Sequence, residues 1–156
     1  MNLKKRRLAR VGVLAGGVAL SVIAATGSAS AYTYDGTSPS STGCSSDGTT
    51  VASAPMKNSA GTMGTIELRY SLTCHTAWAR LTLNYTQFAC GNASAGYACA
   101  AAGITRNNDG RSYSCTISQG QTQCYTPQVY DKGLTSFADG HIDIVSGQID
   151  TRTASY

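Results

Sequence analysis

The chain has 156 residues, of which 42% are hydrophobic and 13% charged, and its formal net charge is +4. Five of the 12 lysines and arginines lie within the first ten residues, so residues 32–156 carry seven basic and eight acidic side chains and a net charge of −1. A nearly neutral domain with scattered arginines lacks the basic patch that binds nucleic acids or anionic membranes. We therefore expect no nucleic-acid partner, and no membrane contact once the N-terminal segment is removed.

The N-terminal segment has the pattern of a secretory signal peptide. A basic start precedes an apolar run at residues 11–25, which is too short to span a bilayer comfortably. The small-residue site Ala29-Ser30-Ala31 follows and predicts cleavage before Tyr32. Residues 1–31 are therefore expected to be a signal peptide of a secreted, extracellular protein, and a retained membrane anchor is the alternative.

The rest of the chain divides into an arm and one domain. Residues 32–43 are rich in Ser, Thr, Gly and Pro and show no periodic apolar pattern, which predicts a flexible arm. Residues 44–156 are expected to form a single domain. Near its start, alternation around Val51 is weak, and Pro55 restricts this stretch to an edge strand or a strand end.

Residues 65–83 carry the strongest pattern in the chain. Apolar residues keep one parity in each of two runs, namely Ile66, Leu68 and Tyr70, then Ala77, Ala79, Leu81 and Leu83. With a short polar link between them, the two runs predict an antiparallel hairpin with an aliphatic core face. The opposite face gathers Glu67, Arg69, Trp78 and Arg80.

This second face has two interpretations. Tryptophan and arginine are frequent interface anchors, and an indole beside guanidinium groups can stack on a sugar or a peptide side chain, so the four residues form a candidate binding face. The alternative is an internal cross-strand cluster, in which Glu67 pairs with Arg80 and Trp78 covers the arginine stem. The small size of the domain favours a structural role for the tryptophan.

The six cysteines predict three disulfides formed in an oxidising compartment, and without a Cys-x-x-Cys pair they do not suggest zinc. Cys90 and Cys99 bracket a loop of small residues that a bridge would fix. If Gln119-Gly120 forms a two-residue turn, Cys115 stands opposite Cys124 at a separation suited to a disulfide. The remaining pair is Cys44 with Cys74, the latter in the link of the central hairpin.

Two further hairpins are expected. Asn107-Asn108-Asp109-Gly110 contains Asp-Gly, a strong turn signal, between two short strands. Near the C-terminus, a turn at Ser146-Gly147 would place Asp143 opposite Asp150, and like charges so placed are unfavourable without a cation. These two aspartates are therefore a weak calcium candidate, with Arg152 on the diagonal as the alternative source of compensation. No other metal and no cofactor is expected.

No stretch shows sustained helical periodicity with caps, and turn signals recur at short spacing. Together these features predict an all-β fold, a small disulfide-braced β-sandwich or barrel of antiparallel hairpins.

Several short motifs then carry a resemblance. They are Gly43-Cys44, Thr50-Val51, IELRYSLTCHTAWAR, RNNDG, Cys124-Tyr125-Thr126-Pro127 and Val129-Tyr130-Asp131. Together they resemble the YjfA family of secreted bacterial proteins, a domain of unknown function, over nearly all of the chain after the signal peptide. The resemblance implies export and a small extracytoplasmic domain suited to sensing or binding, and it supplies no catalytic residues.

The sequence therefore favours a secreted, non-catalytic binding or adaptor domain that recognises an extracellular protein or glycan. A second hypothesis is a small secreted hydrolase with a ribonuclease-like set, Glu67, His75, Arg69 and Arg80. No G-x-S-x-G motif supports another hydrolase type, and the basic surface that collects RNA is missing. A structural component of the cell envelope is a third.

Overall fold

A computed structural model describes residues 32–88, 99–144 and 147–156 of the chain. The expected signal peptide, its cleavage site and Cys90 lie outside these residues. Within them, no helix is both long enough and apolar enough to cross a membrane.

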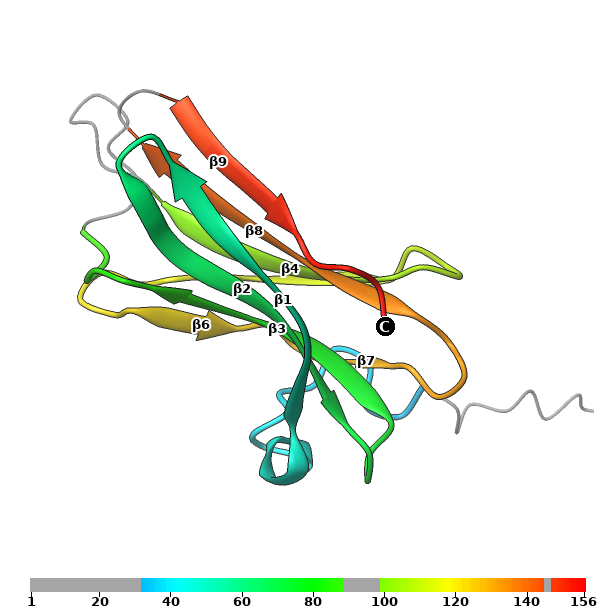
Figure 1. Cartoon of the computed structure of the whole chain (residues 1–156). Helices are drawn as coiled ribbons and strands as arrows, with labels where there is room; N and C mark the ends of the chain where they lie inside the picture. Colours follow the sequence, from blue (N-terminus) through cyan, green and yellow to red (C-terminus); the bar gives the residue numbers. More distant parts are fainter. Residues whose placement is uncertain (1–31, 89–98, 145–146) are drawn as a thin grey trace, which may run out of the picture.

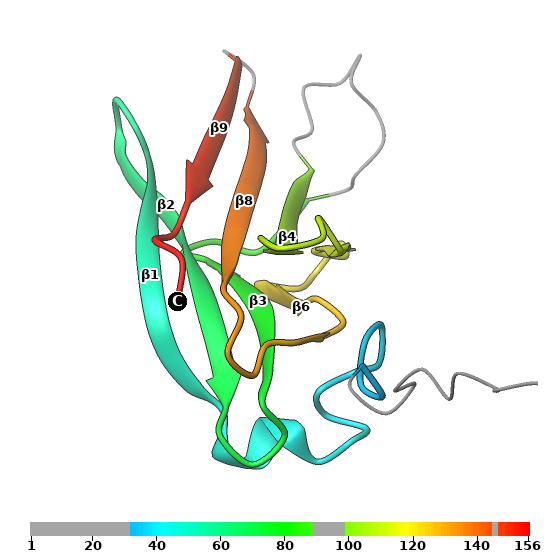
Figure 2. The same cartoon turned by 90° about the vertical axis from the view of Figure 1, so that its right-hand side faces the viewer.

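The fold is all-β, with two antiparallel sheets packed face to face as a sandwich (Figures 1 and 2). Sheet A has the order β1-β2-β3-β6, and β7 also pairs with β3; sheet B has the order β5-β4-β8-β9. A short 3₁₀ helix, η1 (Cys44–Asp47), precedes the first strand. The strands are β1 (Thr49–Asn58), β2 (Gly61–Ser71), β3 (Thr76–Leu83), β4 (Ala100–Arg106), β5 (Ser112–Thr116), β6 (Gln123–Tyr125), β7 (Val129–Tyr130), β8 (Ser136–Ile144) and β9 (Gly147–Arg152).

The predicted central hairpin is confirmed. Strands β2 and β3 pair Ile66 with Leu81 and Leu68 with Ala79, and all four side chains are fully buried. Because side chains alternate along a strand, this parity turns the aliphatic row toward sheet B. The opposing residues of sheet B are mostly small or β-branched: Ala100, Ala102, Ile104, Ala138, Ile142 and Ile149. Strand β1, which contains Pro55, lies at the edge of sheet A as expected.

Two of the three expected disulfides are described, Cys44–Cys74 and Cys115–Cys124. Cys99 is also disulfide-bonded, and its expected partner is the undescribed Cys90. The hairpin from which the Cys115–Cys124 bridge was predicted does not form, however. The turn exists, with Gln121 N–H donating to the Ser118 carbonyl at 3.0 Å, but β5 pairs with β4 and β6 pairs with β3.

The reason is that β5 and β6, which are both short, each pair with a longer strand of a different sheet. Ile117, just after β5, is buried and donates its N–H to the Ala100 carbonyl at 2.8 Å, which keeps this stretch in sheet B. Beyond the turn, Cys124 pairs with Leu81 in sheet A. The disulfide therefore links the two sheets instead of two strands of one hairpin.

The N-terminal segment, expected to be a flexible arm, makes specific contacts with the sandwich. The backbone of Gln128 exchanges hydrogen bonds with Gly36 and Thr37, at 3.0 and 2.9 Å. The Gln128 side-chain amide also donates to the hydroxyls of Thr37 and Thr42, at 3.0 and 2.9 Å. These partners lie about ninety residues apart in the chain, so local composition gives no sign of them.

Arg106, at the end of β4, holds the same segment from the other side. Its side chain is only 1% exposed, and it donates to Asp109 through two nitrogens, at 3.0 and 2.7 Å. Its third nitrogen donates to Asp35 and to the Tyr130 carbonyl, each at 3.0 Å. The hydrogen bonds with Asp109 and the charge of Asp35 raise the pKa of Arg106, and the same Arg106 bonds lower the pKa of Asp109 to about 2.

Asp131 follows β7 and is a buried carboxylate, only 3% exposed. Neither of its oxygens accepts a well-formed hydrogen bond from the described residues. Burial raises its pKa to about 6, against smaller opposing effects of Ser136 and Arg106. Compared with the unfolded chain, the folded domain therefore favours the protonated form of this carboxyl group.

This shift predicts a pH-dependent stability. A carboxyl whose pKa is raised on folding stabilises the fold at low pH, and this contribution is lost as the pH rises from about 4 to about 6. We expect Asp131→Asn to raise the melting temperature at pH 7 and to flatten its dependence on pH between 4 and 6. The measurement is a series of thermal melts across that range.

Asp139→Asn, a half-buried aspartate on the outer face of sheet B, is the matched control and should keep the slope of the parent. A melting temperature of Asp131→Asn that changes between pH 4 and 6 as much as the parent's would contradict the assignment.

Candidate functional site

The candidate binding face lies on the outer side of sheet A. Register pairs Glu67 directly with Arg80 and Arg69 with Trp78, so the four side chains share the face turned away from sheet B. The structure thus brings together all four residues that the sequence singled out. Their environments differ from one another, and these differences decide what the face can do.

Glu67 and Arg80 form an ion pair across the strands. Arg80 donates from Nη2 to Glu67 Oε1 at 2.7 Å, and its Nε donates to the other carboxylate oxygen. The Thr50 hydroxyl donates to Glu67 as well, at 2.7 Å. Burial alone would raise the pKa of Glu67, but the hydrogen bonds from Arg80 and Thr50 outweigh it and lower that pKa. Glu67 is thus held as a carboxylate with its oxygens occupied.

Arg69 has neutral partners only. Its Nη1 donates to the Thr50 hydroxyl at 2.9 Å, and its Nη2 donates to the Gly48 carbonyl. No carboxylate lies within ion-pair distance of it among the described residues, and its buried Nε has no hydrogen-bond partner there. Burial and the nearby charge of Arg80 lower the pKa of Arg69. The cluster of two guanidinium groups and one carboxylate therefore keeps one uncompensated positive charge.

Trp78 is a buried support for this face. Its side chain is 1% exposed, although it stands on the outer side of the sheet. Gly48 lies directly over the indole, so a Cβ atom at this position would come within 2.5 Å of Trp78 Cη2. The tryptophan thus has the structural role predicted by the second interpretation of this face. Only a residue without a side chain lets the chain leave η1 across the ring.

A cavity of about 560 Å³ opens beside these residues, within the size range of small-ligand sites. We call it the arginine cavity, and its lining is Ser38, Pro39, Ser40, Ser45, Arg69, Trp78, Arg80 and Tyr125. One wall comes from the N-terminal segment, which Figure 1 shows in blue and cyan near β7. The other comes from Tyr125 of β6, which is 45% exposed and stands opposite Arg80.

Sequence reasoning missed both of these walls. Tyr125 reaches the site through the pairing of β6 with β3, and residues 38–40 reach it through the contacts of Gln128 and Arg106. Neither pairing leaves a periodic pattern in the chain, because each depends on segments far apart in sequence. The Cys124-Tyr125-Thr126-Pro127 motif contains Tyr125 but does not indicate its neighbours.

The ribonuclease-like set is not assembled. His75 lies in the turn between β2 and β3, with a positive φ of 54°, and its Nδ1 is 3.4 Å from the Tyr70 hydroxyl. Tyr70 points into the sandwich, whereas Glu67 points out of it. The imidazole and the carboxylate are therefore associated with opposite faces of sheet A.

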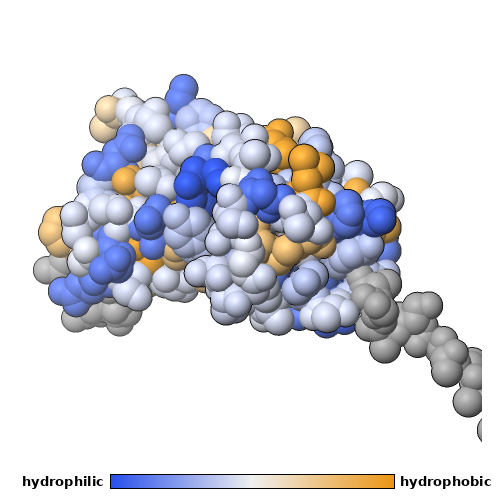
Figure 3. All heavy atoms as spheres, turned by 90° about the horizontal axis from the view of Figure 1, so that it is seen from below, coloured by the Kyte–Doolittle hydropathy of each residue, from blue (hydrophilic) through white to orange (hydrophobic). Residues whose placement is uncertain are grey.

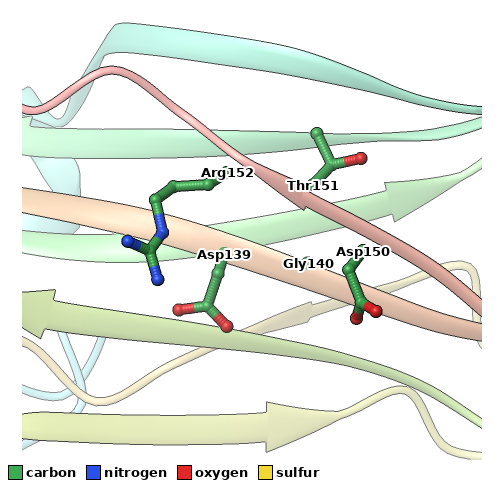
Figure 4. Close-up of a pocket in the computed structure, with 5 residues that line it drawn as sticks. All are labelled: Asp139, Gly140, Asp150, Thr151 and Arg152. Carbon is green, nitrogen blue, oxygen red and sulfur yellow. The ribbon is translucent and has the colours of Figure 1, made fainter.

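A second hollow, of about 330 Å³, lies on the outer face of sheet B. Figure 4 shows Asp139 and Arg152, from paired positions of β8 and β9, with Asp150 on the same side. The guanidinium of Arg152 lies over the ring of Phe137, 3.8 Å from its centroid.

The weak calcium candidate at Asp143 and Asp150 relied on a register that is wrong. Strands β8 and β9 pair Asp143 with Gln148 and His141 with Asp150, two residues away from the expected alignment. The imidazole of His141 lies between the two carboxylates, 2.6 Å from Asp150 and 2.8 Å from Asp143. The hydrogen bonds with Asp150 and Asp143 raise the pKa of His141. The group that lies between the two carboxylates is therefore His141, whereas Arg152 stands opposite Asp139.

Comparison with known proteins then places the chain. Residues 32–138 match the model of the family described as "Protein of unknown function (DUF2690)". The chain is also 39% identical to "Uncharacterized protein YjfA" of Bacillus subtilis (strain 168), over 82% of this chain and 83% of the relative. The chain belongs to this family. No solved structure matches it.

The family match bears differently on the two hollows. Every residue that lines the arginine cavity, from Ser38 to Tyr125, falls within the matched residues 32–138. The hollow on sheet B is lined by Asp139, Gly140, Asp150, Thr151 and Arg152, all beyond the matched segment. The arginine cavity is therefore the site that the family's own segment builds.

The buried position of Trp78 yields a stability prediction. Trp78→Ala should lower the free energy of unfolding by roughly 3–5 kcal/mol, because it removes a large buried ring. Gly48→Ala should cost about 1–3 kcal/mol by forcing a methyl group against the indole. Urea denaturation under non-reducing conditions measures both.

Tyr125→Ala is the control, since this ring lies on the same face but is 45% exposed. Its loss of stability should stay below about 1 kcal/mol. Equal losses for Trp78→Ala and Tyr125→Ala would show that the indole is not a buried support.

Proposed function

We propose that the chain is a secreted, non-catalytic binding domain that recognises an extracellular protein or glycan through the arginine cavity. The observation that carries this proposal is the cavity itself. It places two guanidinium groups and an exposed phenol around one concave site, on strands whose register is fixed by a buried core. Arginine and tyrosine are among the residues that dominate recognition sites.

The state of Glu67 supports binding over catalysis. A general acid or base needs a pKa near the working pH and a proton-transfer atom free to reach the substrate. Glu67 has a lowered pKa and is engaged by Arg80 and Thr50, and no histidine lies among the residues that line the cavity. The same groups suit recognition, which requires charge and fixed geometry but no proton transfer.

The described disulfides support an extracellular location, because such bridges persist in oxidising compartments. The surface suits a polar partner. Exposed large hydrophobic residues are few among the described ones, and Figure 3 shows hydrophilic residues around small hydrophobic groups on the face seen from below. A cavity with two guanidinium groups and three serines on such a surface favours a partner recognised by charge and hydrogen bonds over one recognised by a large apolar area.

The test is affinity capture from culture supernatant and isolated cell wall, with the processed protein as bait. Arg69→Ala and Tyr125→Ala change lining residues on two different strands, β2 and β6, and should each weaken binding of the captured partner by roughly 2 kcal/mol, about thirtyfold in Kd. Titration of the partner against the bait gives these values.

Arg111→Ala is the matched control, because this arginine lies in the β4–β5 turn and does not line the cavity. It should bind like the parent. Thermal melts establish that each variant is folded. A partner that binds all three variants as tightly as the parent would place the recognition surface elsewhere.

A further inference from the structure

The charge of the arginine cavity indicates the sign of its ligand. Arg80 is neutralised by Glu67, whereas Arg69 has only neutral acceptors, Thr50 and Gly48. The lining of the cavity contains no carboxylate. One positive charge thus remains in a concave site, where solvent screens it less than on an open surface, and it favours an anionic group.

The available donors suit a carboxylate. A guanidinium group has five N–H donors in a planar fork that matches the two oxygens of a carboxylate. Arg80 uses one N–H of each of Nε and Nη2 for Glu67 and also interacts with the Tyr125 hydroxyl, which leaves further N–H groups of its fork for a ligand. Each Nη of Arg69 keeps a second N–H beyond the one that it donates. Donors from both arginines therefore remain for one incoming anion.

The rest of the lining suits a sugar better than a peptide. Ser38, Ser40 and Ser45 offer hydroxyl groups, which both donate and accept hydrogen bonds and so match the hydroxyls of a sugar ring. Pro39 supplies the one aliphatic side chain among the lining residues, a small surface for the side chain of a peptide, and the tryptophan is covered by Gly48. Tyr125 alone exposes an aromatic ring at the rim, where it can pack against the C–H face of a sugar.

From these observations we infer that the arginine cavity binds the carboxylate-bearing sugar of an acidic extracellular polysaccharide, a uronate. This inference rests on the proposed function and specifies its ligand class. The carboxylate pairs with Arg69 and Arg80, the ring hydroxyls bond to the serines of the N-terminal wall, and the ring packs on Tyr125.

The cavity is built before any ligand arrives. The wall at residues 38–40 is held by hydrogen bonds from Thr42 and Ser45 to the carbonyls of Ser38 and Pro39, at 3.2 and 2.9 Å. The opposite wall is fixed by β3 and β6. A preformed site loses little conformational entropy on binding, which suits a small hydrophilic ligand with little apolar area to bury.

The experiment measures binding of short uronate oligomers by titration calorimetry. The probes are oligogalacturonate, oligoguluronate from alginate, and hyaluronan oligosaccharides. The matched neutral probe is oligogalacturonate with methyl-esterified carboxyl groups, which keeps the sugar chain and removes the charge. A glutamate hexapeptide tests a carboxylate on a peptide.

We expect at least one uronate oligomer to bind about tenfold or more tightly than its neutral counterpart or than the hexapeptide. Its affinity should fall with added salt. Arg69→Gln should lose most of this preference for the acidic form, and Tyr125→Ala should weaken acidic and neutral oligomers equally. Arg111→Ala should match the parent.

Three outcomes overturn the inference: no binding of any uronate oligomer, equal binding of the acidic and esterified forms, or tighter binding of the hexapeptide. These failures differ from failure of the proposed function. If capture of a partner still depends on Arg69 and Tyr125 while no uronate binds, the cavity is a binding site for another ligand class. If capture does not depend on them either, both proposals fall.

Discussion

The buried guanidinium of Arg106 is the constraint on which the shape of the outer surface depends. A charge that is 1% exposed must be surrounded by acceptors, and Arg106 takes them from three separate segments: Asp35, Asp109 and the Tyr130 carbonyl. Removing one partner of such a cluster leaves a buried charge uncompensated, which is far more costly than losing an exposed pair. The N-terminal segment is therefore attached to both β4 and β7 by a single side chain.

That attachment gives sheet A a cavity where it would otherwise have an open face. The segment that contains Asp35 continues to residues 38–40, which form one wall, and then to η1, which Cys44 joins to Cys74. Between the disulfide and β1, Gly48 crosses Trp78 and accepts a hydrogen bond from Arg69. One path along the backbone thus closes the wall, covers the indole and positions the guanidinium group that carries the free charge.

Sequence reasoning succeeded where the signal is local and failed where it is not. Parity alone identified the core of β2 and β3, and an Asp-Gly turn identified the β4–β5 hairpin. The β8–β9 register was wrong by two residues, a slip that leaves every side chain on its expected face, so alternation cannot detect it. Likewise, Cys115–Cys124 was found through a hairpin that does not form, because a turn does not reveal which sheet each strand joins.

The two interpretations of the outer face of sheet A, a structural cluster and a binding site, turn out to be compatible. The structural reading holds for Trp78, which is buried, and for the Glu67–Arg80 pair, which joins β2 to β3. Yet Glu67, the one carboxylate among these four residues, is paired with Arg80. Arg69 therefore has only neutral acceptors, and it lines the arginine cavity. A structural ion pair therefore creates the unbalanced charge of the site. Specificity for an anion follows from the same contacts that hold the strands together, because one carboxylate cannot neutralise two guanidinium groups.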